Sequence, residues 1–265
     1  MRPIFHVAIA AGMIFAGALG LTSREVELGL PDTSAIVDYH PSVGQIFVPL
    51  TAIPQVVRHA FLAAEDDDFY RHGAVDFPMM VRALGLDVLR FDSGRRPLGA
   101  STITQQLVKN LIVGDKLSID RKIREAVLAF RIERRLSKDR ILEIYLNEVN
   151  LGCHSHGVAE AALNYFSKPV TELSIDEAAF LGGLPKAPSH YNPLRYPDAA
   201  RSRRNWVIDR MVHDGYVAPG QVATLKAEPL RLGPDHCDRG SGGDEANEPA
   251  KVVGVSGDTN RLLAR

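Results

Sequence analysis

The stretch Arg121–Val149, RKIREAVLAFRIERRLSKDRILEIYLNEV, is the longest helical pattern in this 265-residue chain, and it decides the fold class. Its apolar residues recur at the spacing of a helix face, first in Ile123–Phe130 and again in Ile141–Tyr145. Ser137 stands between these two halves, where a serine side chain commonly caps the start of a helix. The stretch therefore predicts two successive amphipathic helices in a mainly α-helical protein.

Helical patterns continue on both sides of this stretch. Gln55–Glu65 carries one apolar side, and Pro197–Asp214 is followed by a glycine, as helices often are. Ser174–Glu177, SIDE, has the form of a capping box and opens an apolar helix that Pro185 ends. Asp76–Phe91 predicts a helix that is apolar nearly all round, which suits burial or a membrane surface.

The flanks of this helical region differ in composition. Residues 23–48 are broken by prolines and glycines and predict a linker with one short strand, for which Ser34–Tyr39 and Gln45–Val48 show some alternation. From Gly233 onward the chain is rich in Gly, Asp, Glu and Ser, which predicts a disordered tail over 233–265. The folded domain is accordingly expected at 49–232.

The first residues predict export from the cytoplasm. Residues 3–21, PIFHVAIAAGMIFAGALGL, contain no Asp, Glu, Lys or Arg, and a helix of that length rises about 28 Å, close to the ~30 Å hydrocarbon core of a bilayer. Arg2 precedes the run, which favours an anchor at 1–22 with its amino end in the cytoplasm. A cleaved signal peptide is the alternative, since Ala16–Ala18 has the small residues of a cleavage site.

The charge balance excludes one class of partner. The formal net charge of −1 argues against a general nucleic-acid binder, whose surface would be basic overall, so any polyanion must bind a local cluster of cations. The two cysteines, Cys153 and Cys237, do not make a disulfide framework.

A run of four acids, Glu65–Asp68, lies in the segment AAEDDDFYRHGAVDF of residues 63–77. Consecutive acids point in different directions and suit a single metal ion poorly, so a solvated helix end and a catalytic carboxylate remain as interpretations. Glu65 follows an apolar run, and an apolar wall raises the pKa of a carboxyl group toward that of a general acid or base. Phe69 and Tyr70 are candidates for part of that wall, and the last two acids of the run are expected in solvent.

Two further clusters carry polar chemistry. In Gly99–Asn110, GASTITQQLVKN, Ser101 or Thr102 can cap a helix, and the hydroxyl, amide and lysine side chains suit a hydroxyl-rich or phosphate-bearing ligand. A capped polar helix without a ligand is the alternative there. In Arg121–Glu125, RKIRE, two cations share a helix face with the glutamate, which makes either a surface ion-pair cluster or a pyrophosphate site.

Taken together, these segments resemble glycosyltransferase family 51, the peptidoglycan glycosyltransferase module of class A penicillin-binding proteins and of monofunctional transglycosylases. The resemblance rests on EDDDFYRHGAVD, GASTITQQLVKN, RKIREAVLAFRIERRLSKDRILEIYLNEVNLG and RRNWVIDRM, which occur in the family's order between about Pro49 and Leu225. The chain departs from the family at His72–Ala74, where the glycine follows the histidine directly. It also shows no Ser-x-x-Lys motif of a transpeptidase domain.

The resemblance implies a fold and a location. The fold is a mainly α-helical, lysozyme-like lobe with a smaller membrane-facing jaw around residues 76–120, preceded by the N-terminal transmembrane helix. The protein would span the cytoplasmic (inner) membrane once, with its catalytic domain on the periplasmic or extracellular face. Its partners would be lipid II, the growing glycan strand, the membrane and other cell-wall synthesis proteins, and not nucleic acid.

The implied reaction is the polymerisation of lipid II into glycan strands, with inversion at the anomeric carbon and release of undecaprenyl pyrophosphate. Glu65 would be the general base, while Glu125 with Lys109, Arg121 and Lys122 would steady the pyrophosphate. The residues that would position the sugars and phosphates are Ser101, Thr102, Gln105, Gln106 and Asn110. No cofactor is required and no metal ligand set is predicted, although some family members use a divalent cation.

Two other classes stay open on the sequence. A lytic enzyme on the same lysozyme-like lobe would also use one glutamate, but it would not need the cationic cluster. A non-catalytic, membrane-anchored remnant of a bifunctional penicillin-binding protein fits the shifted Gly73 and the missing transpeptidase motif, whereas the intact Glu65 and cationic cluster argue against it. Incubation with labelled lipid II discriminates between these classes.

Overall fold

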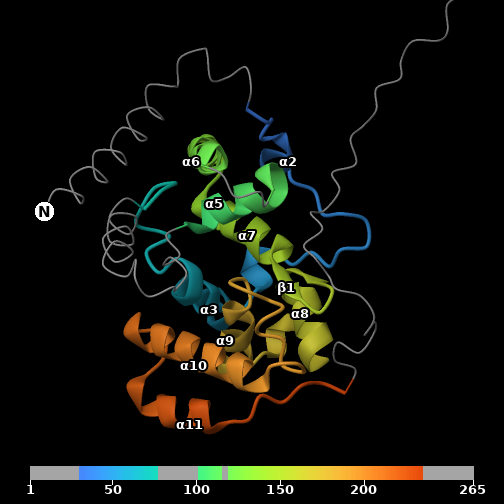
Figure 1. The fold of residues 1–265 in the computed structure, drawn as a ribbon, viewed down its shortest axis with the longest axis vertical. Coiled ribbons are helices and arrows are strands. Elements are labelled where there is room, and N and C mark those ends of the chain that lie inside the picture. Colours follow the sequence, from blue (N-terminus) through green and yellow to red (C-terminus); the bar gives the residue numbers. More distant parts are fainter. Residues whose placement is uncertain (1–29, 77–100, 115–118, 235–265) are drawn as a thin grey trace, which may run out of the picture.

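The computed structural model describes residues 30–76, 101–114 and 119–234, and these ranges are mainly α-helical, as predicted (Figure 1). Within them, no helix is both long and apolar enough to cross a bilayer.

Several predicted segments lie outside the described residues. They are the membrane anchor at 1–22, nearly all of the apolar helix Asp76–Phe91, much of the jaw at 76–120 and nearly all of the tail at 233–265. These four stay predictions.

The long stretch that set the fold class forms two helices, as predicted. Helix α6 spans Ile119–Glu133 and α7 spans Lys138–Glu148. The break falls at Ser137, whose side-chain oxygen accepts a hydrogen bond of 3.2 Å from the backbone N–H of Arg140. Because a helix start leaves its first N–H groups without internal partners, this bond fixes where α7 begins.

Three further predicted helices are present and pack against one another: α3 (Gln55–Glu65), α9 (Ile175–Gly183) and α10 (Pro197–His213). The capping box predicted before α9 is confirmed. The Ser174 side chain accepts a hydrogen bond from the backbone N–H of Glu177, and the Glu177 side chain accepts one from the backbone N–H of Ser174. The start of α9 is therefore set by four consecutive residues.

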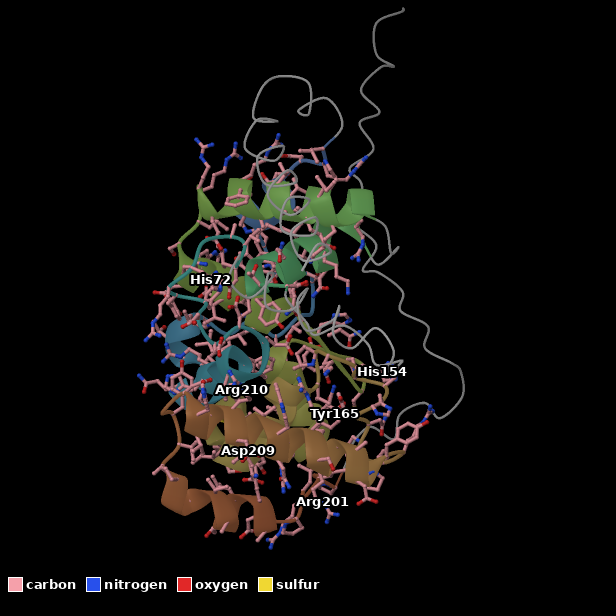
Figure 2. All side chains as sticks on the ribbon, turned by 60° about the vertical axis from the view of Figure 1, so that its left-hand side comes forward. His72, His154, Tyr165, Arg201, Asp209 and Arg210 are labelled. Carbon is pink, nitrogen blue, oxygen red and sulfur yellow. The ribbon has the colours of Figure 1, made fainter. Side chains whose placement is uncertain are left out.

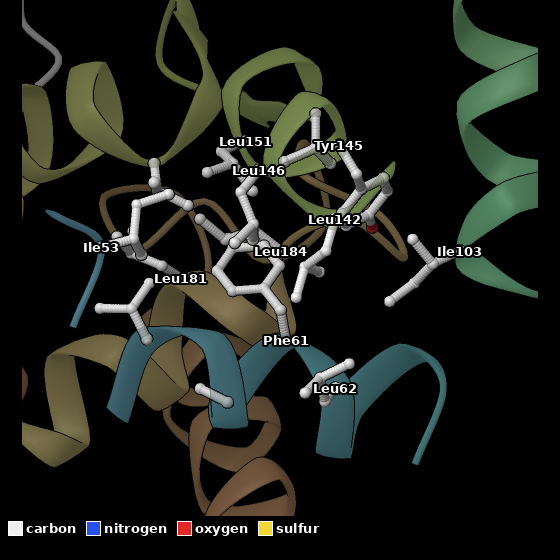
Figure 3. Packing of buried hydrophobic residues seen from close by; sticks show 14 of the residues in the cluster. Ile53, Phe61, Leu62, Ile103, Leu142, Tyr145, Leu146, Leu151, Leu181 and Leu184 are labelled. Carbon is white, nitrogen blue, oxygen red and sulfur yellow. The ribbon is translucent and has the colours of Figure 1, made fainter. Parts of the chain in front are cut away.

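Helices α3 and α9 cross at very close range, and this contact places the end of α3. A Cβ atom at Gly182 of α9 would lie 2.8 Å from the backbone of Ala60 in α3, so the crossing requires a residue without a side chain. Phe61, the next residue of α3, is fully buried beside side chains of α7 and α9 (Figure 3). The core residues labelled around it include Leu142, Tyr145, Leu146, Leu181 and Leu184.

The remaining elements connect these helices. Helix α5 (Ile103–Val108) continues into a single π-helical turn, Lys109–Val113, and α8 spans Gly157–Phe166. A short antiparallel hairpin of β1 (Asn150–Gly152) and β2 (Ser155–His156) joins α7 to α8. The other short elements are 3-10 turns at Leu50–Ala52, Val170–Glu172 and Pro219–Gln221, and the helix α11 at Val222–Ala227.

The turn of this hairpin has backbone conformations that residues other than glycine seldom adopt. Cys153 and His154 both have a φ of 53°. Cys153 is disulfide-bonded, and Cys237, the only other cysteine of the sequence, lies outside the described residues. A covalent bond therefore holds the first left-handed residue of the turn.

The segment before α3 packs on the helical body, and the strand expected within Ser34–Tyr39 is wrong. The chain there forms the short helix α2 (Ser34–Val37), in which Ile36 is fully buried. The Tyr39 hydroxyl donates a 2.5 Å hydrogen bond to Glu148 of α7. Contact with α7 decides this conformation, and a few alternating residues carry no signal of that contact.

Candidate active site

The acids Glu65–Asp68 point to four different places at the end of α3. Each has its own partner, and in chain order these partners include Gln106, Ile103, Arg210 and Arg71. Among the described residues, no group of three or more His, Cys, Asp or Glu side chains is arranged to hold a metal ion. The run is therefore a set of four separate contacts, as the divergence of consecutive acids predicts.

Glu65 is the last residue of α3, and its carboxylate is held inside the protein between α5 and α10. Its Oε2 atom accepts a 2.8 Å hydrogen bond from the Gln106 side chain. Its Oε1 atom lies 3.8 Å from Nη2 of Arg203 and, among the described residues, has no hydrogen-bond partner. The side chain is only 11% exposed, and buried polar atoms normally have a hydrogen-bond partner. The Oε1 atom is therefore left to accept a hydrogen bond from a bound molecule.

Burial raises the pKa of Glu65 above its ordinary value. The hydrogen bond from Gln106 and the positive charges of Arg203 and Lys186 act in the opposite direction, and the neighbouring charge of Asp66 adds to the rise. The net pKa is raised, so this carboxylate holds a proton more tightly than a solvated glutamate does. A general base works best when its pKa approaches the working pH, and burial moves Glu65 in that direction.

Of the two aromatic residues predicted to form the wall around Glu65, one is buried and the other is exposed. Phe69 is fully buried, but Tyr70 is 51% exposed and donates a 2.8 Å hydrogen bond to Asp139 at the start of α7. The prediction for Tyr70 is wrong, because a surface carboxylate holds its hydroxyl away from the core. Tyr145 of α7 is fully buried instead, and its hydroxyl donates to the Gln106 side chain at 3.3 Å.

In the polar helix predicted at Gly99–Asn110, two of the candidate ligand-binding residues hydrogen-bond to each other. The Thr102 side chain accepts a 3.2 Å hydrogen bond from the N–H of Gln105, whose side chain accepts a 3.1 Å bond from the N–H of Thr102. The Thr102 hydroxyl also donates to the Ala74 carbonyl at 2.8 Å. Both residues are 2% exposed. They build the start of α5, and their assignment as substrate-binding residues stays a prediction.

The other candidates of this helix stay accessible. Ser101, Gln106 and Lys109 are half-buried, and Asn110 is exposed. Lys109 and Asn110 belong to the π-helical turn after α5, and such turns are frequent at functional sites. Gln106 of α5 therefore faces Glu65, while Lys109 and Asn110 of the π-helical turn stay accessible.

Glu125 is the centre of the predicted cationic cluster and is 2% exposed. Its two carboxylate oxygens accept hydrogen bonds from Arg121 at 2.6 Å and from Lys122 at 2.9 Å. Lys122 also donates to the Ser101 hydroxyl at 2.6 Å, so the cluster of α6 joins the polar segment before α5. A surface ion pair would leave the carboxylate in water, whereas this one is buried and fixes both cations.

Arg203 of α10 is a site residue that the sequence analysis did not single out. Its side chain is 7% exposed, and its Nε donates a 3.0 Å hydrogen bond to the carbonyl of Gly183. Its guanidinium lies 4.1 Å from the centre of the Trp206 ring. Arg203 begins the segment RRNWVIDRM, so a signal was present, but only the packing of α10 on α3 brings this cation to Glu65.

The loop after Glu65 is joined to the start of α5 despite the departure from the family at His72–Ala74. The backbone of Gly73 needs no positive φ, and a Cβ atom there would meet nothing within 4 Å, so this position does not require glycine. Ala74 is buried, and its carbonyl accepts the hydrogen bond from Thr102.

The family model described as transglycosylase matches residues 34–212, which is most of the chain. The chain belongs to the transglycosylase family. It is 41% identical over 249 residues to penicillin-binding protein 1A of Rickettsia felis and 38% identical over 242 residues to that of Escherichia coli. These alignments cover 86% and 84% of this chain but only 31% and 28% of the relatives, so the chain spans about a third of their length.

A solved structure of penicillin-binding protein 1A from Haemophilus influenzae is also similar to this chain. The sequence identity is 26% and the TM-score is 0.41, over 71% of this chain and 18% of that one. The family match begins at residue 34, so it includes α2 and the segment that packs on α7.

Asp67 was expected in solvent, but the structure places it against α10. Its side chain is 26% exposed and is paired with Arg210 of α10, which Figure 2 labels. Asp68, by contrast, is 54% exposed and is paired with Arg71, which is 86% exposed. The pair made by Asp67 therefore ties the end of α3 to α10, while the pair made by Asp68 lies at the surface.

We expect Asp67→Asn to lower the melting temperature by about 2–4 °C, since a partly buried ion pair contributes on the order of 1 kcal/mol. Asp68→Asn is the matched control and should shift the melting temperature by less than about 1 °C, because exposed pairs contribute little. Thermal unfolding followed by circular dichroism measures both. Equal melting temperatures for the two variants would show that the Asp67 pair adds nothing to stability.

Proposed function

We propose that this transglycosylase polymerises lipid II into glycan strands and releases undecaprenyl pyrophosphate. The observation that carries the proposal is the presence of two different sites. One is the nearly buried Glu65 carboxylate, of which one oxygen has no hydrogen-bond partner among the described residues, and the other is a cationic cluster that Glu125 holds in place. A lytic enzyme would need the first site only. The names of the relatives, penicillin-binding protein 1A, support the assignment.

In the proposed reaction, Oε1 of Glu65 accepts the proton of the attacking 4-hydroxyl as its oxygen forms a bond to the anomeric carbon of the donor strand. The bond between that carbon and the pyrophosphate oxygen breaks at the same time, with inversion. The pyrophosphate leaves as an anion and needs no proton, so a single base is sufficient. Gln106 orients the carboxylate through Oε2, and Arg203 helps keep it ionised despite its burial.

Negative charge builds up on the pyrophosphate leaving group in this reaction. We assign the binding of this group to Arg121 and Lys122. Both cations keep their positions through Glu125, so they need little rearrangement as the transition state forms. Ser101, Lys109 and Asn110 would contact the phosphates and sugars from the segments around α5. In the proposed mechanism these side chains stabilise all of the negative charge on the pyrophosphate, and no cofactor is required.

The proposal includes a place in the cell. A lipid-linked substrate fits a protein anchored by the predicted segment 1–22 in the cytoplasmic membrane, with the described helices on its outer face. Other cell-wall synthesis proteins would be its partners there.

Incubation of the detergent-solubilised protein with labelled lipid II tests the proposal, with the products sized by gel electrophoresis. We expect long glycan chains and free undecaprenyl pyrophosphate. Fragments released from finished peptidoglycan, without polymer from lipid II, would identify a lytic enzyme instead. Binding of lipid II without any turnover would identify the non-catalytic remnant.

The pH dependence of polymerisation should report the environment of Glu65. A protonated carboxyl group cannot accept the proton, so kcat should rise with pH through a pKa above the ordinary value of glutamate. Arg203→Gln removes a neighbouring positive charge, which should move this rise to higher pH. Arg201→Gln is the matched control, because Arg201 lies on the same helix but is 59% exposed and pairs with Asp198 (Figure 2). An unchanged midpoint in Arg203→Gln would exclude the electrostatic role of Arg203.

A further inference from the structure

Asp66 and His72 form a buried pair next to the proposed base. Asp66 directly follows α3, and its Oδ1 atom lies 2.5 Å from Nε2 of His72. Its Oδ2 atom accepts a 2.9 Å hydrogen bond from the backbone N–H of Ile103, the first residue of α5. The side chains are 5% and 12% exposed, so this contact is shielded from water. Figure 2 shows His72 on the loop that follows α3.

The partners of His72 determine how many protons its ring carries. Nε2 faces the Asp66 carboxylate, and Nδ1 lies 2.5 Å from the backbone carbonyl of Gly73. A carboxylate and a carbonyl can only accept hydrogen bonds, so both ring nitrogens must donate. A ring that donates from both nitrogens is an imidazolium cation. The buried charge of Asp66 is therefore neutralised by a buried charge of opposite sign.

The same loop closes on the start of α5 at a second point, where the Thr102 hydroxyl donates to the Ala74 carbonyl at 2.8 Å. One helical turn after Ile103, α5 presents Gln106, whose side chain donates to Glu65. Two consecutive acids at the end of α3 thus bond to α5. Asp66 accepts from its first residue, Ile103, and Glu65 accepts from Gln106, three residues further along α5. Any movement of the start of α5 changes the position of Gln106 relative to Glu65.

We propose that Asp66 and His72 are positioning residues that clamp the start of α5 to the end of α3, and that all hydrogen bonds of this clamp form together only while His72 is protonated. The clamp holds Gln106 against Glu65 and so fixes the direction of the unpartnered oxygen Oε1. The catalytic part of this inference rests on the proposed function, in which Glu65 is the base. The structural part, a clamp controlled by the charge of His72, does not depend on the substrate.

The groups that face His72 come from two elements and from its own loop. Burial lowers its pKa, and the positive charge of Lys138 at the start of α7 acts in the same direction. The hydrogen bond and the charge of Asp66, with the Gly73 carbonyl, act in the other direction, so the net pKa lies above the ordinary value of histidine. A raised pKa in the folded state means that the clamp stabilises the protein fully at low pH and that this stability is lost as pH rises through that pKa.

Three variants test the clamp. His72→Gln removes the charge, and Asp66→Asn removes the partner charge while its amide can still accept from Ile103 and donate to a neutral imidazole. His213→Gln is the matched control, since His213 also pairs with an aspartate, Asp214 at 2.8 Å, but is 71% exposed. Melting temperatures and kcat with lipid II are measured for all four proteins across the range from about pH 5.5 to 9.

At pH values above the rise in kcat that Glu65 causes, we expect the melting temperature and kcat of the wild type and His213→Gln to fall together with one midpoint. His72→Gln should lose this fall and show a kcat lowered by about tenfold to a hundredfold at pH 6, as misplaced catalytic groups do, with KM nearly unchanged. Asp66→Asn should recover activity as pH rises, because its amide suits the neutral ring. That reversal distinguishes the clamp from simple destabilisation.

The melting curves need no substrate, so the two hypotheses can fail separately. If the wild type does not use lipid II but shows the pH-dependent stability that His72→Gln lacks, the proposed function is wrong and the clamp stands. If His72→Gln and the wild type share the same pH dependence of melting temperature, the clamp is wrong whatever the substrate. If His72→Gln does not fold, Asp66→Asn decides, because a fall in its stability at high pH like that of the wild type contradicts the proposal.

Discussion

Glu65→Gln should abolish the polymerisation of lipid II, with kcat lowered by about 10²–10⁴-fold, the usual contribution of a general base. The amide has nearly the shape of the carboxylate, and its oxygen can still accept the hydrogen bond from Gln106. It cannot take a proton from the attacking hydroxyl. Single-turnover polymerisation with labelled lipid II measures the loss, and binding of lipid II should be largely retained.

Stability separates this catalytic effect from damage to the fold. A buried carboxylate with a raised pKa is held at a cost in stability, so Glu65→Gln should leave the melting temperature unchanged or increase it. Asp68→Asn is the control, since Asp68 lies three residues on and is 54% exposed, and it should keep full activity. If Glu65→Gln retains more than about a tenth of the wild-type rate, Glu65 is not the base.

Lys122→Gln should lower kcat/KM by about one to two decades. A charge-assisted contact to the pyrophosphate contributes roughly 1.5–3 kcal/mol, and each 1.36 kcal/mol corresponds to about a factor of ten in rate. Lys122 is the better choice than Arg121 for this test, because it is 44% exposed and Arg121 is 12% exposed beside the buried Glu125. Either substitution removes one partner of the buried Glu125. Arg121 is itself nearly buried, so its loss would lower stability more than the loss of Lys122.

Lys168→Gln is a closely matched control for this experiment. Lys168 is 41% exposed and pairs with Glu177, which is 9% exposed, whereas Lys122 is 44% exposed and pairs with Glu125, which is 2% exposed. Both substitutions break one contact between a lysine and a buried glutamate, and Lys122→Gln also loses the hydrogen bond to the Ser101 hydroxyl. The melting temperature of Lys122→Gln should therefore fall at least as far as that of Lys168→Gln. Only Lys122→Gln should change kcat/KM. Equal kinetics for the two variants would make the cluster around Glu125 an ordinary structural ion pair.

Local signals predicted the helices well. Ser137 and the box of Ser174 and Glu177 act through hydrogen bonds to backbone groups three residues away, so their neighbours in sequence are also their neighbours in space. The same holds for Arg121, Lys122 and Glu125, whose spacing on one helix makes their contact predictable.

The prediction of the site was less complete because most of its contacts join distant segments. For Glu65, the sequence left open a solvated helix end and a carboxylate against an apolar wall, and the structure shows its side chain only 11% exposed. Its neighbours Arg203 and Gln106 come from α10 and α5, and the inward turn of Thr102 depends on the Ala74 carbonyl. These contacts have no fixed spacing along the chain.

The amino-acid sequence by itself determined where the helices α3, α7, α9 and α10 form and which acid stands at the end of α3, because capping and periodicity act within about one helical turn. Only the tertiary structure decided which of the four consecutive acids is buried without a full set of hydrogen bonds among the described residues, which is paired with α10, and which bonds to the start of α5. The close crossing of α3 and α9 at Gly182 sets this outcome, since it fixes the direction in which α3 ends and hence what each successive side chain meets.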